Sequence, residues 1–226
     1  MSYDKELGQK VHQHLLSLGI ETPMTDLVHK DSDQKIKEIE PLIAEFMKIL
    51  GMDLSDDSLA ETPRRVAKMY VNELCAGLNY DHFPKCTTVE NKMASKDEFV
   101  CVTDIKLVSI CEHHLLMFAG TKPGYAGATV AYFPNDKVLG ISKINKCVAF
   151  FGARSQIQER YTIQVAEALK CILGTEDVAV YMESQHTCTS IRGIKDTSSS
   201  TVTASLHGRF LHDDNVRKEF LTIAKK

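Results

Sequence analysis

Hydrophobic residues recur at helical spacing over the first ninety positions of the chain. The pattern predicts three helices, over residues 7–16, 36–50 and 63–77. Gly19 and Gly51 end the first two, and Pro63 suits the first turn of the third. The polar stretch between the first two helices, from Glu21 to Gln34, indicates a linker.

From Phe99 onward the hydrophobic pattern changes to alternation, which is typical of strands. We expect strands over 99–110 and 125–133, paired as a hairpin, and over 177–184 and 200–210, with helices within 142–173 and a short helix from Asp213. The helical stretch breaks near residues 152–155, where Ser155 is expected to cap the second helix with Gln158 as its capping-box partner. This β-β-α-α-β-β order predicts an α+β fold with helices on one side of an antiparallel sheet. We place a domain boundary between a helical region, 1–95, and a second domain, 96–226.

Composition narrows the class of protein. A net charge of −3 and a pI near 6.3 give no electrostatic reason to expect nucleic acid or a membrane surface as partner. No apolar run approaches the roughly 20 residues of a membrane span, and the N-terminus lacks the apolar core of a signal peptide. Seven cysteines, an odd number at irregular spacing, favour reduced thiols over a disulfide framework. A cytoplasmic protein is expected.

Two short segments carry metal-binding chemistry: Cys111-Glu112-His113-His114 and His186-Thr187-Cys188. Both lie where a predicted strand ends, so antiparallel pairing can bring them together. Thiolates and imidazole suit zinc. If Cys111, His114 and Cys188 are the ligands, the fourth position stays open, as in catalytic zinc sites, and His113 and His186 are free for proton transfer. A Cys111–Cys188 disulfide and hydrogen-bonded core histidines are the alternatives.

Several basic residues can bind an anion, although each can equally belong to a solvated helix face. They are Arg64, Arg65, Lys68, Lys143, Lys146 and Arg192. Lys143 and Lys146 share one face at the start of a helix, whose N-terminus attracts anions, and Ser142 adds a hydroxyl donor. Glu159 is either an exposed helical carboxylate or a reader of the guanine N1–H and amine.

Five segments in order make the chain resemble the GTP cyclohydrolase I family from about residue 33 to the C-terminus. They are residues 61–70 (ETPRRVAKMY), 109–114 (SICEHH), 140–144 (GISKI), 156–160 (QIQER) and 186–193 (HTCTSIRG). The resemblance implies a tunnelling fold, or T-fold, whose sheets join between subunits into a five-membered barrel. Two such rings stack into a toroidal decamer with active sites between subunits, where Arg65 and Lys68 serve a neighbour's site.

The resemblance also implies a reaction. A zinc-dependent enzyme, with one Zn²⁺ per subunit, hydrolyses GTP at C8 to formate and 7,8-dihydroneopterin triphosphate, the first step towards tetrahydrofolate and pterins. Cys111, His114 and Cys188 would hold the zinc, and His113 and His186 would move protons. Glu159 would anchor the guanine, with Gln158 nearby. The triphosphate would meet Ser142, Lys143, Lys146, Arg192, Arg65 and Lys68.

The chain departs from the family pattern at four places. Lys146 stands where Arg is more usual, Tyr161 where Leu is, and Gly152 where Ser or Ala is. Residues 117–127 suggest an extended hairpin loop that either reshapes the pocket entrance or decorates the surface. Alternatives therefore stay open: a divergent paralogue for another purine nucleotide or a deazapurine pathway, a catalytically silent nucleotide-binding regulatory module, or a structural zinc protein.

Overall fold

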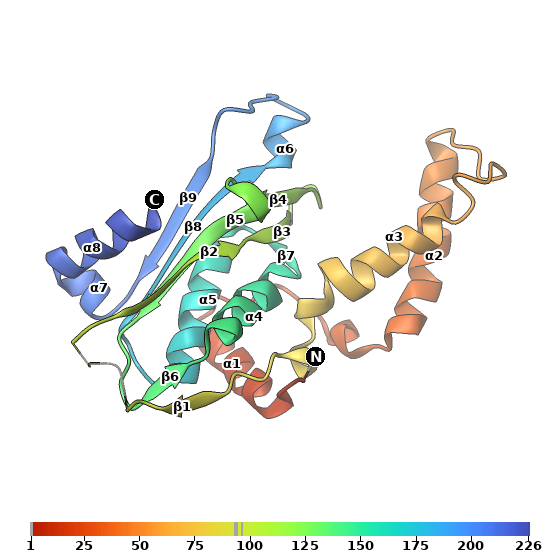
Figure 1. Cartoon of the computed structure of the whole chain (residues 1–226). Coiled ribbons are helices and arrows are strands. Elements are labelled where there is room, and N and C mark those ends of the chain that lie inside the picture. The colour runs from red at the N-terminus through yellow and green to blue at the C-terminus, as the bar shows by residue number, and fades with distance from the viewer. Residues whose placement is uncertain (1, 93–94, 96) are drawn as a thin grey trace.

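A seven-stranded sheet forms the centre of the molecule, as the computed structural model of residues 2–92, 95 and 97–226 shows (Figure 1). Its strands are β2 (Val100–Lys106), β3 (Val108–Cys111), β4 (Met117–Gly120), β5 (Ala126–Tyr132), β7 (Ser155–Gln156), β8 (Val178–His186) and β9 (Thr201–Leu206). They run in the order β2-β5-β8-β4-β3-β7, and β9 also pairs with β8. All pairings are antiparallel except β3 with β7. A separate two-stranded ladder joins β1 (Thr88–Glu90) to β6 (Lys137–Leu139).

The helices lie in three groups. The longer ones are α1 (Lys5–Ser17), α2 (Ser32–Ile49), α3 (Thr62–Met69), α4 (Ile141–Gly152), α5 (Gln158–Leu173) and α8 (Asp214–Ala224). Short turns are η1 (Asp26–His29), η2 (Tyr70–Leu74), η3 (Ala76–Leu78), η4 (Tyr80–His82), η5 (Pro123–Tyr125), α6 (Thr187–Ser190) and α7 (Arg209–His212). Helices α4, α5 and α1 cover one face of the sheet, α7 and α8 lie across the other, and α2 with α3 form an arm that projects from the body (Figure 1).

The two faces of the sheet differ by alternation along β5 and β8. Val130 and Val180 belong to the main core beneath α4 and α5, whereas Ala131 and Ala179 pack against Phe210 and Phe220. The second cluster corrects the expectation of helices on one side only, because α7 and α8 bury apolar residues on the opposite face. The mixed α+β class is confirmed, whereas the expected ββααββ order is interrupted by the further strands β3, β4, β6 and β7.

The long first strand expected over 99–110 is two strands. They divide at Leu107, between Lys106 of β2 and Val108 of β3. Within β2, Asp104 adopts a left-handed backbone, with φ of 54°, and the register with β5 shifts around it. The predicted hairpin loop at 117–127 is also partly wrong, because Met117–Gly120 is strand β4, between β3 and β8 in the sheet. Gly120 and Gly127 belong to this crowded crossing, where a Cβ on Gly120 would lie 2.3 Å from the Ala126 carbonyl oxygen. These glycines serve close packing of strands and not a loop.

One local expectation fails near α4 and α5. Ser155 does not cap α5; it pairs with Ile110 as part of β7, and Ile157 holds the cap position without a side-chain hydrogen bond. Gly152 and Tyr161, two of the positions at which the chain departs from the family pattern, lie next to each other. A Cβ on Gly152 would lie 2.6 Å from the Tyr161 hydroxyl oxygen. That hydroxyl donates a hydrogen bond to the Val148 carbonyl at 2.8 Å. The larger side chain thus occupies space that the glycine leaves.

The segment expected to be a linker begins with a buried polar cluster. Thr22 is buried, and Glu21 accepts hydrogen bonds from Tyr80 at 2.6 Å and Arg154 at 3.3 Å. Arg154 is fully buried and its guanidinium lies over the rings of Tyr80, Phe150 and Phe151. Burial raises the pKa of Tyr80, so its hydroxyl stays protonated and donates to Glu21. This cluster fastens the chain after α1 to the end of α4.

Candidate metal centre

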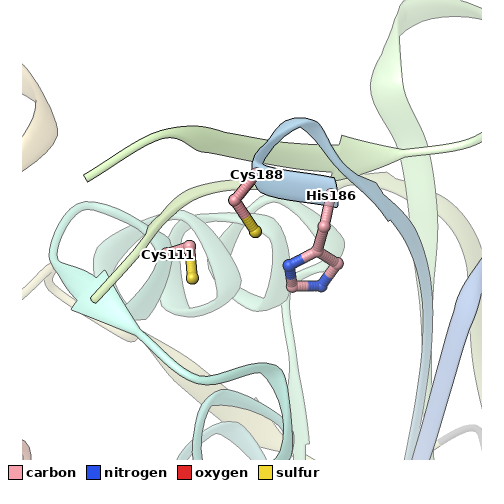
Figure 2. Close-up of side chains that lie close together, drawn as sticks. All are labelled: Cys111, His186 and Cys188. Carbon is pink, nitrogen blue, oxygen red and sulfur yellow. The ribbon is translucent and has the colours of Figure 1, made fainter. Parts of the chain in front are cut away.

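Sheet order brings the two sequence segments together. Cys111 ends β3, His186 ends β8, and β4 pairs with both strands, so the two ends meet at one edge. The thiols of Cys111 and Cys188 and the imidazole of His186 place one ligand atom each within 4.8 Å of one another. Figure 2 shows the two sulfur atoms and one ring nitrogen of His186 turned toward a common point. All seven cysteines are free, so the disulfide alternative is wrong.

Backbone hydrogen bonds fix the turn that carries Cys111. The Cys111 N–H donates to the Leu116 carbonyl and the Leu115 N–H donates back to the Cys111 carbonyl, both at 2.8 Å. Leu115 takes a left-handed conformation, with φ of 54°, to close this turn. The Glu112 side chain forms an ion pair with Arg160 of α5. The metal-facing thiol therefore sits on a rigid strand end.

The His186 ring is held on two sides. Its Nε2 lies 2.9 Å from Gln158 Oε1, and its face stacks on Phe118 with ring centroids 4.4 Å apart. Because Nε2 is engaged, Nδ1 is the nitrogen left to face the thiols. Burial lowers the pKa of His186, against the opposing influence of the Glu159 carboxylate. Burial and the neighbouring Cys111 thiol raise the pKa of Cys188.

The other two histidines lie at the exposed rim. His113 Nδ1 is 3.7 Å from the Cys111 sulfur. His114, expected as the third ligand, has its Nε2 2.9 Å from an Arg192 guanidinium nitrogen and is outside the group of three. Arg192 is thus the one predicted phosphate contact that the described part of the chain places beside this group.

Gln158 and Glu159 lie at the start of α5 and differ in their surroundings. Gln158 is buried, donates to the Met182 and Thr201 carbonyls at 3.2 and 2.9 Å, and accepts from Ser184 at 2.6 Å. Its side chain is therefore committed to holding His186 and the sheet. Glu159 is exposed.

The remaining basic residues are placed elsewhere in the chain. Arg65 and Lys68 are exposed on α3, in the projecting arm. Ser142, Lys143 and Lys146 lie in the first turns of α4, and the two lysines are close enough to Cys86 to affect its pKa, which burial raises to about 11. Gly152, at the other end of α4, contacts Val108 of β3. At 1.5 Å per residue, Ser142 is about 15 Å back along the helix from that contact.

Sequence reasoning missed the residues that support the metal group. Arg160, Gln156 and Phe118 were given no role, although the first two lie in the QIQER segment. The sequence signal for Arg160 is weak, because an arginine in the first turn of a helix is ordinarily a solvated side chain.

Fold and site together define a mixed α+β protein with two thiols and an imidazole arranged to hold a metal ion. The sequence profile of GTP cyclohydrolase I matches residues 39–225. A GTP cyclohydrolase 1 of Histophilus somni is 51% identical over 217 residues, 96% of each chain. Those of Erwinia tasmaniensis and Haemophilus ducreyi are 50% and 48% identical, over 93% and 100% of each chain. The chain belongs to the GTP cyclohydrolase I family.

Proposed function

We propose that this chain is a zinc-dependent GTP cyclohydrolase I, which hydrolyses GTP at C8 to formate and 7,8-dihydroneopterin triphosphate. The observation that carries the proposal is the group formed by Cys111, His186 and Cys188 within a chain of this family. Residues 96–226 would form a catalytic T-fold domain behind the helical region 1–95. No helix of the described residues is long and apolar enough to cross a membrane. We place the enzyme in the cytoplasm because its seven cysteines favour a reducing compartment.

Zinc fits the donor set better than other common metals do. Two thiols with an imidazole are soft to borderline ligands, which suit zinc, whereas magnesium and calcium prefer oxygen. A bound zinc ion supplies Lewis-acid activation of the water used in hydrolysis. The two thiols serve as ligands whether His114 or His186 completes the set, so the two possible assignments differ only in the third ligand.

We assign the third ligand position to His114 and proton transfer to His186 and His113. His114 follows Cys111 by three residues in the same turn and is exposed, so its side chain has room to rotate away from Arg192. His186 is already held by Gln158 and Phe118, which suits a group that must present a proton at a fixed place. The geometry of the group of three favours the opposite assignment, with His186 as ligand.

Zinc content separates the two assignments. We expect His114→Ala to lose the bound zinc, and His186→Ala to keep it while turnover falls. The reverse result would make His186 the ligand and His114 the residue left for proton transfer. Both variants are measured by metal analysis after dialysis, with the wild-type protein as reference.

Glu159 is the residue we assign to guanine recognition. A carboxylate accepts from the N1–H and the exocyclic amine of guanine together, and Glu159 is exposed and directly follows Gln158, which holds His186. Gln158, the preceding residue, contributes to the site by holding the His186 ring in place. We expect Glu159→Ala to weaken GTP binding while leaving zinc content unchanged.

The triphosphate half of the site requires a second subunit in this proposal. Arg192 lies at the metal group, but the α4 residues Ser142, Lys143 and Lys146 do not, and Arg65 with Lys68 lie on the projecting arm. A ring in which each sheet edge meets its neighbour would bring these positive charges to an adjacent metal group. We propose two stacked rings of five subunits, with one zinc per subunit.

The deciding assay incubates the purified protein with GTP and follows formate release and the fluorescence of the oxidised pterin. We expect both products. Formate without a pterin would support a divergent paralogue, one acting on another purine nucleotide or serving a deazapurine pathway. Neither product, with GTP still stabilising the fold, would indicate a silent nucleotide-binding module.

A further inference from the structure

We propose that Arg160 is a positioning residue for the metal centre: together with Gln156 it braces Glu112 and so holds the Cys111 thiol in place against Cys188 and His186. The proposal rests on the proposed function, because it concerns the same metal group. Arg160 touches neither a metal-facing atom nor a position assigned to substrate. It acts through the residue next to Cys111.

Three contacts close a ring around Glu112. The Glu112 N–H donates to the Gln156 carbonyl at 3.0 Å, and Arg160 Nε donates to the Gln156 side-chain oxygen at 3.2 Å. A terminal nitrogen of Arg160 then donates to the Glu112 carboxylate. Cys111 itself is paired in register with Gln156 across the β3–β7 bridge. Glu112 cannot move relative to α5 without breaking the ring, and Cys111 is its direct chain neighbour.

The ring is anchored in the protein core. Gln156 is fully buried, and its amide nitrogen donates to the Phe151 carbonyl at 3.0 Å and to Gln164 Oε1 at 2.8 Å. Gln164, also fully buried, donates onward to the Ile20 carbonyl at 2.8 Å and to Thr22 at 3.2 Å. A continuous polar path thus joins the segment after α1 to the turn that carries Cys111. Residues 20 and 22 lie outside the stretch matched by the family profile.

The geometry indicates positioning more than stability. The Arg160 and Glu112 side chains are 13% and 30% exposed, so water reaches the carboxylate and screens the pair, which limits its contribution to the free energy of folding. Arginine, however, offers several donors in a rigid fork, and here two of them meet different acceptors. Partners that orient metal ligands in this way characteristically affect metal affinity or activity by about 10- to 100-fold.

Cobalt substitution tests the brace, because the absorption of Co²⁺–thiolate bonds reports the geometry of the two thiolates, Cys111 and Cys188. In the full-length Arg160→Met variant we expect an altered Co²⁺–thiolate spectrum and release of zinc to a chelator about 10- to 100-fold faster than in wild type. With GTP, kcat should fall and KM should change little. Arg160→Lys keeps the charge but not the fork, so it should restore these properties only in part.

Lys170→Met is the matched control. Lys170 lies on the same helix, is also 13% exposed and pairs with Glu167, but it is ten residues from Arg160. We expect a wild-type cobalt spectrum and wild-type zinc release. A shift as large as that of Arg160→Met would mean that any broken pair on α5 disturbs the site, and would overturn the proposal.

Glu112→Gln keeps the test valid if Arg160→Met does not fold, because it removes the charge from the ring without changing its size. Faster zinc release from this variant supports the brace. A folded Arg160→Met or Glu112→Gln protein with a wild-type spectrum and zinc release overturns it. A wild-type protein that binds zinc but forms no formate from GTP would instead overturn the proposed function, while the spectral comparison would still decide the brace.

Discussion

The metal-binding region and the basic region of this molecule are built in different ways. The basic region consists of Arg65 and Lys68 on α3 and of Ser142, Lys143 and Lys146 on α4. Cys111, His186 and Cys188 are buried or half-buried at or just after the ends of the two strands that flank β4. Hydrogen bonds, ring stacking and a tight turn hold this group. Arg65 and Lys68 lie exposed on the projecting arm, and Ser142 is exposed at the start of α4. One region is organised within a single chain, whereas the other presents its polar and charged groups to solvent.

The two designs suit the two tasks of the proposed enzyme. Metal geometry must be accurate to about half an ångström, which a sheet edge can supply. Triphosphate binding depends on summed positive charge, which can be contributed across a subunit boundary. A change in the metal-binding region should therefore abolish the chemistry, whereas a change in the basic region should weaken triphosphate binding and be complemented only by a neighbouring subunit that keeps the intact basic residues.

The largest effect on activity is expected from a substitution in the metal-binding region. Cys188→Ser should lose zinc and all measurable turnover with GTP, because a hydroxyl is a poor substitute for a zinc-binding thiolate. Cys171→Ser, a half-buried cysteine on α5, is the control and should keep both. Metal analysis and formate release measure the outcome. Full activity of a zinc-free preparation would contradict the whole assignment.

The cluster around Glu21 should matter for stability. Glu21→Ala leaves the fully buried Arg154 guanidinium without its carboxylate, which should cost about 3–5 kcal/mol in the free energy of unfolding. Urea denaturation followed by circular dichroism measures it. Lys122→Ala, which removes an exposed pair with Asp104, should change the same quantity by less than about 1 kcal/mol. Equal losses in the free energy of unfolding for the two variants would show that the pair of Glu21 with Arg154 contributes no more than an exposed surface pair.

The rim of the metal group should show an intermediate effect on rate. His113→Ala is expected to retain zinc and lose at least about tenfold in kcat, since general acid–base groups contribute on the order of 10²–10⁴-fold. Because His113 is exposed, the substitution should leave the fold intact, and a melting curve checks this point. Unchanged kcat would remove His113 from the proton-transfer assignment.

Mixing two impaired variants tests whether the basic region serves a neighbour. Cys188→Ser lacks the metal half and Lys143→Ala weakens the phosphate half. If the halves come from adjacent subunits, random co-assembly should leave about a quarter of sites with both halves intact. Formate release from the mixture, compared with each variant alone, measures this. No recovery after verified mixing would place both halves in one chain.

Sequence reasoning succeeded where local pattern decides structure. Alternation predicted the pairing of β2 with β5, and helical spacing with a break predicted α4 and α5. The thiols of Cys111 and Cys188 were found because few residues other than cysteine offer a soft ligand at a strand end. Local pattern failed where partners are distant: β4 was missed because its glycines suggested a loop, yet they permit close strand packing. Glu21 and Thr22 were read as linker because their partners lie in α5 and after α4.

The placement of α1 has a consequence for the timing of synthesis. Three residues in or just after α1 form hydrogen bonds with distant partners: His14 with Glu167, Ile20 with Gln164, and Glu21 with Arg154. The partners lie 153, 144 and 133 positions further along the chain, respectively. At 5–20 residues per second, the docking surface for α1 does not exist until roughly 7–30 s after α1 itself has been made. Throughout that interval the apolar side chains of Val11 and Leu15, fully buried in the finished protein, have no partner surface on α5. Helix α1 is thus made well before the surface on which it finally packs.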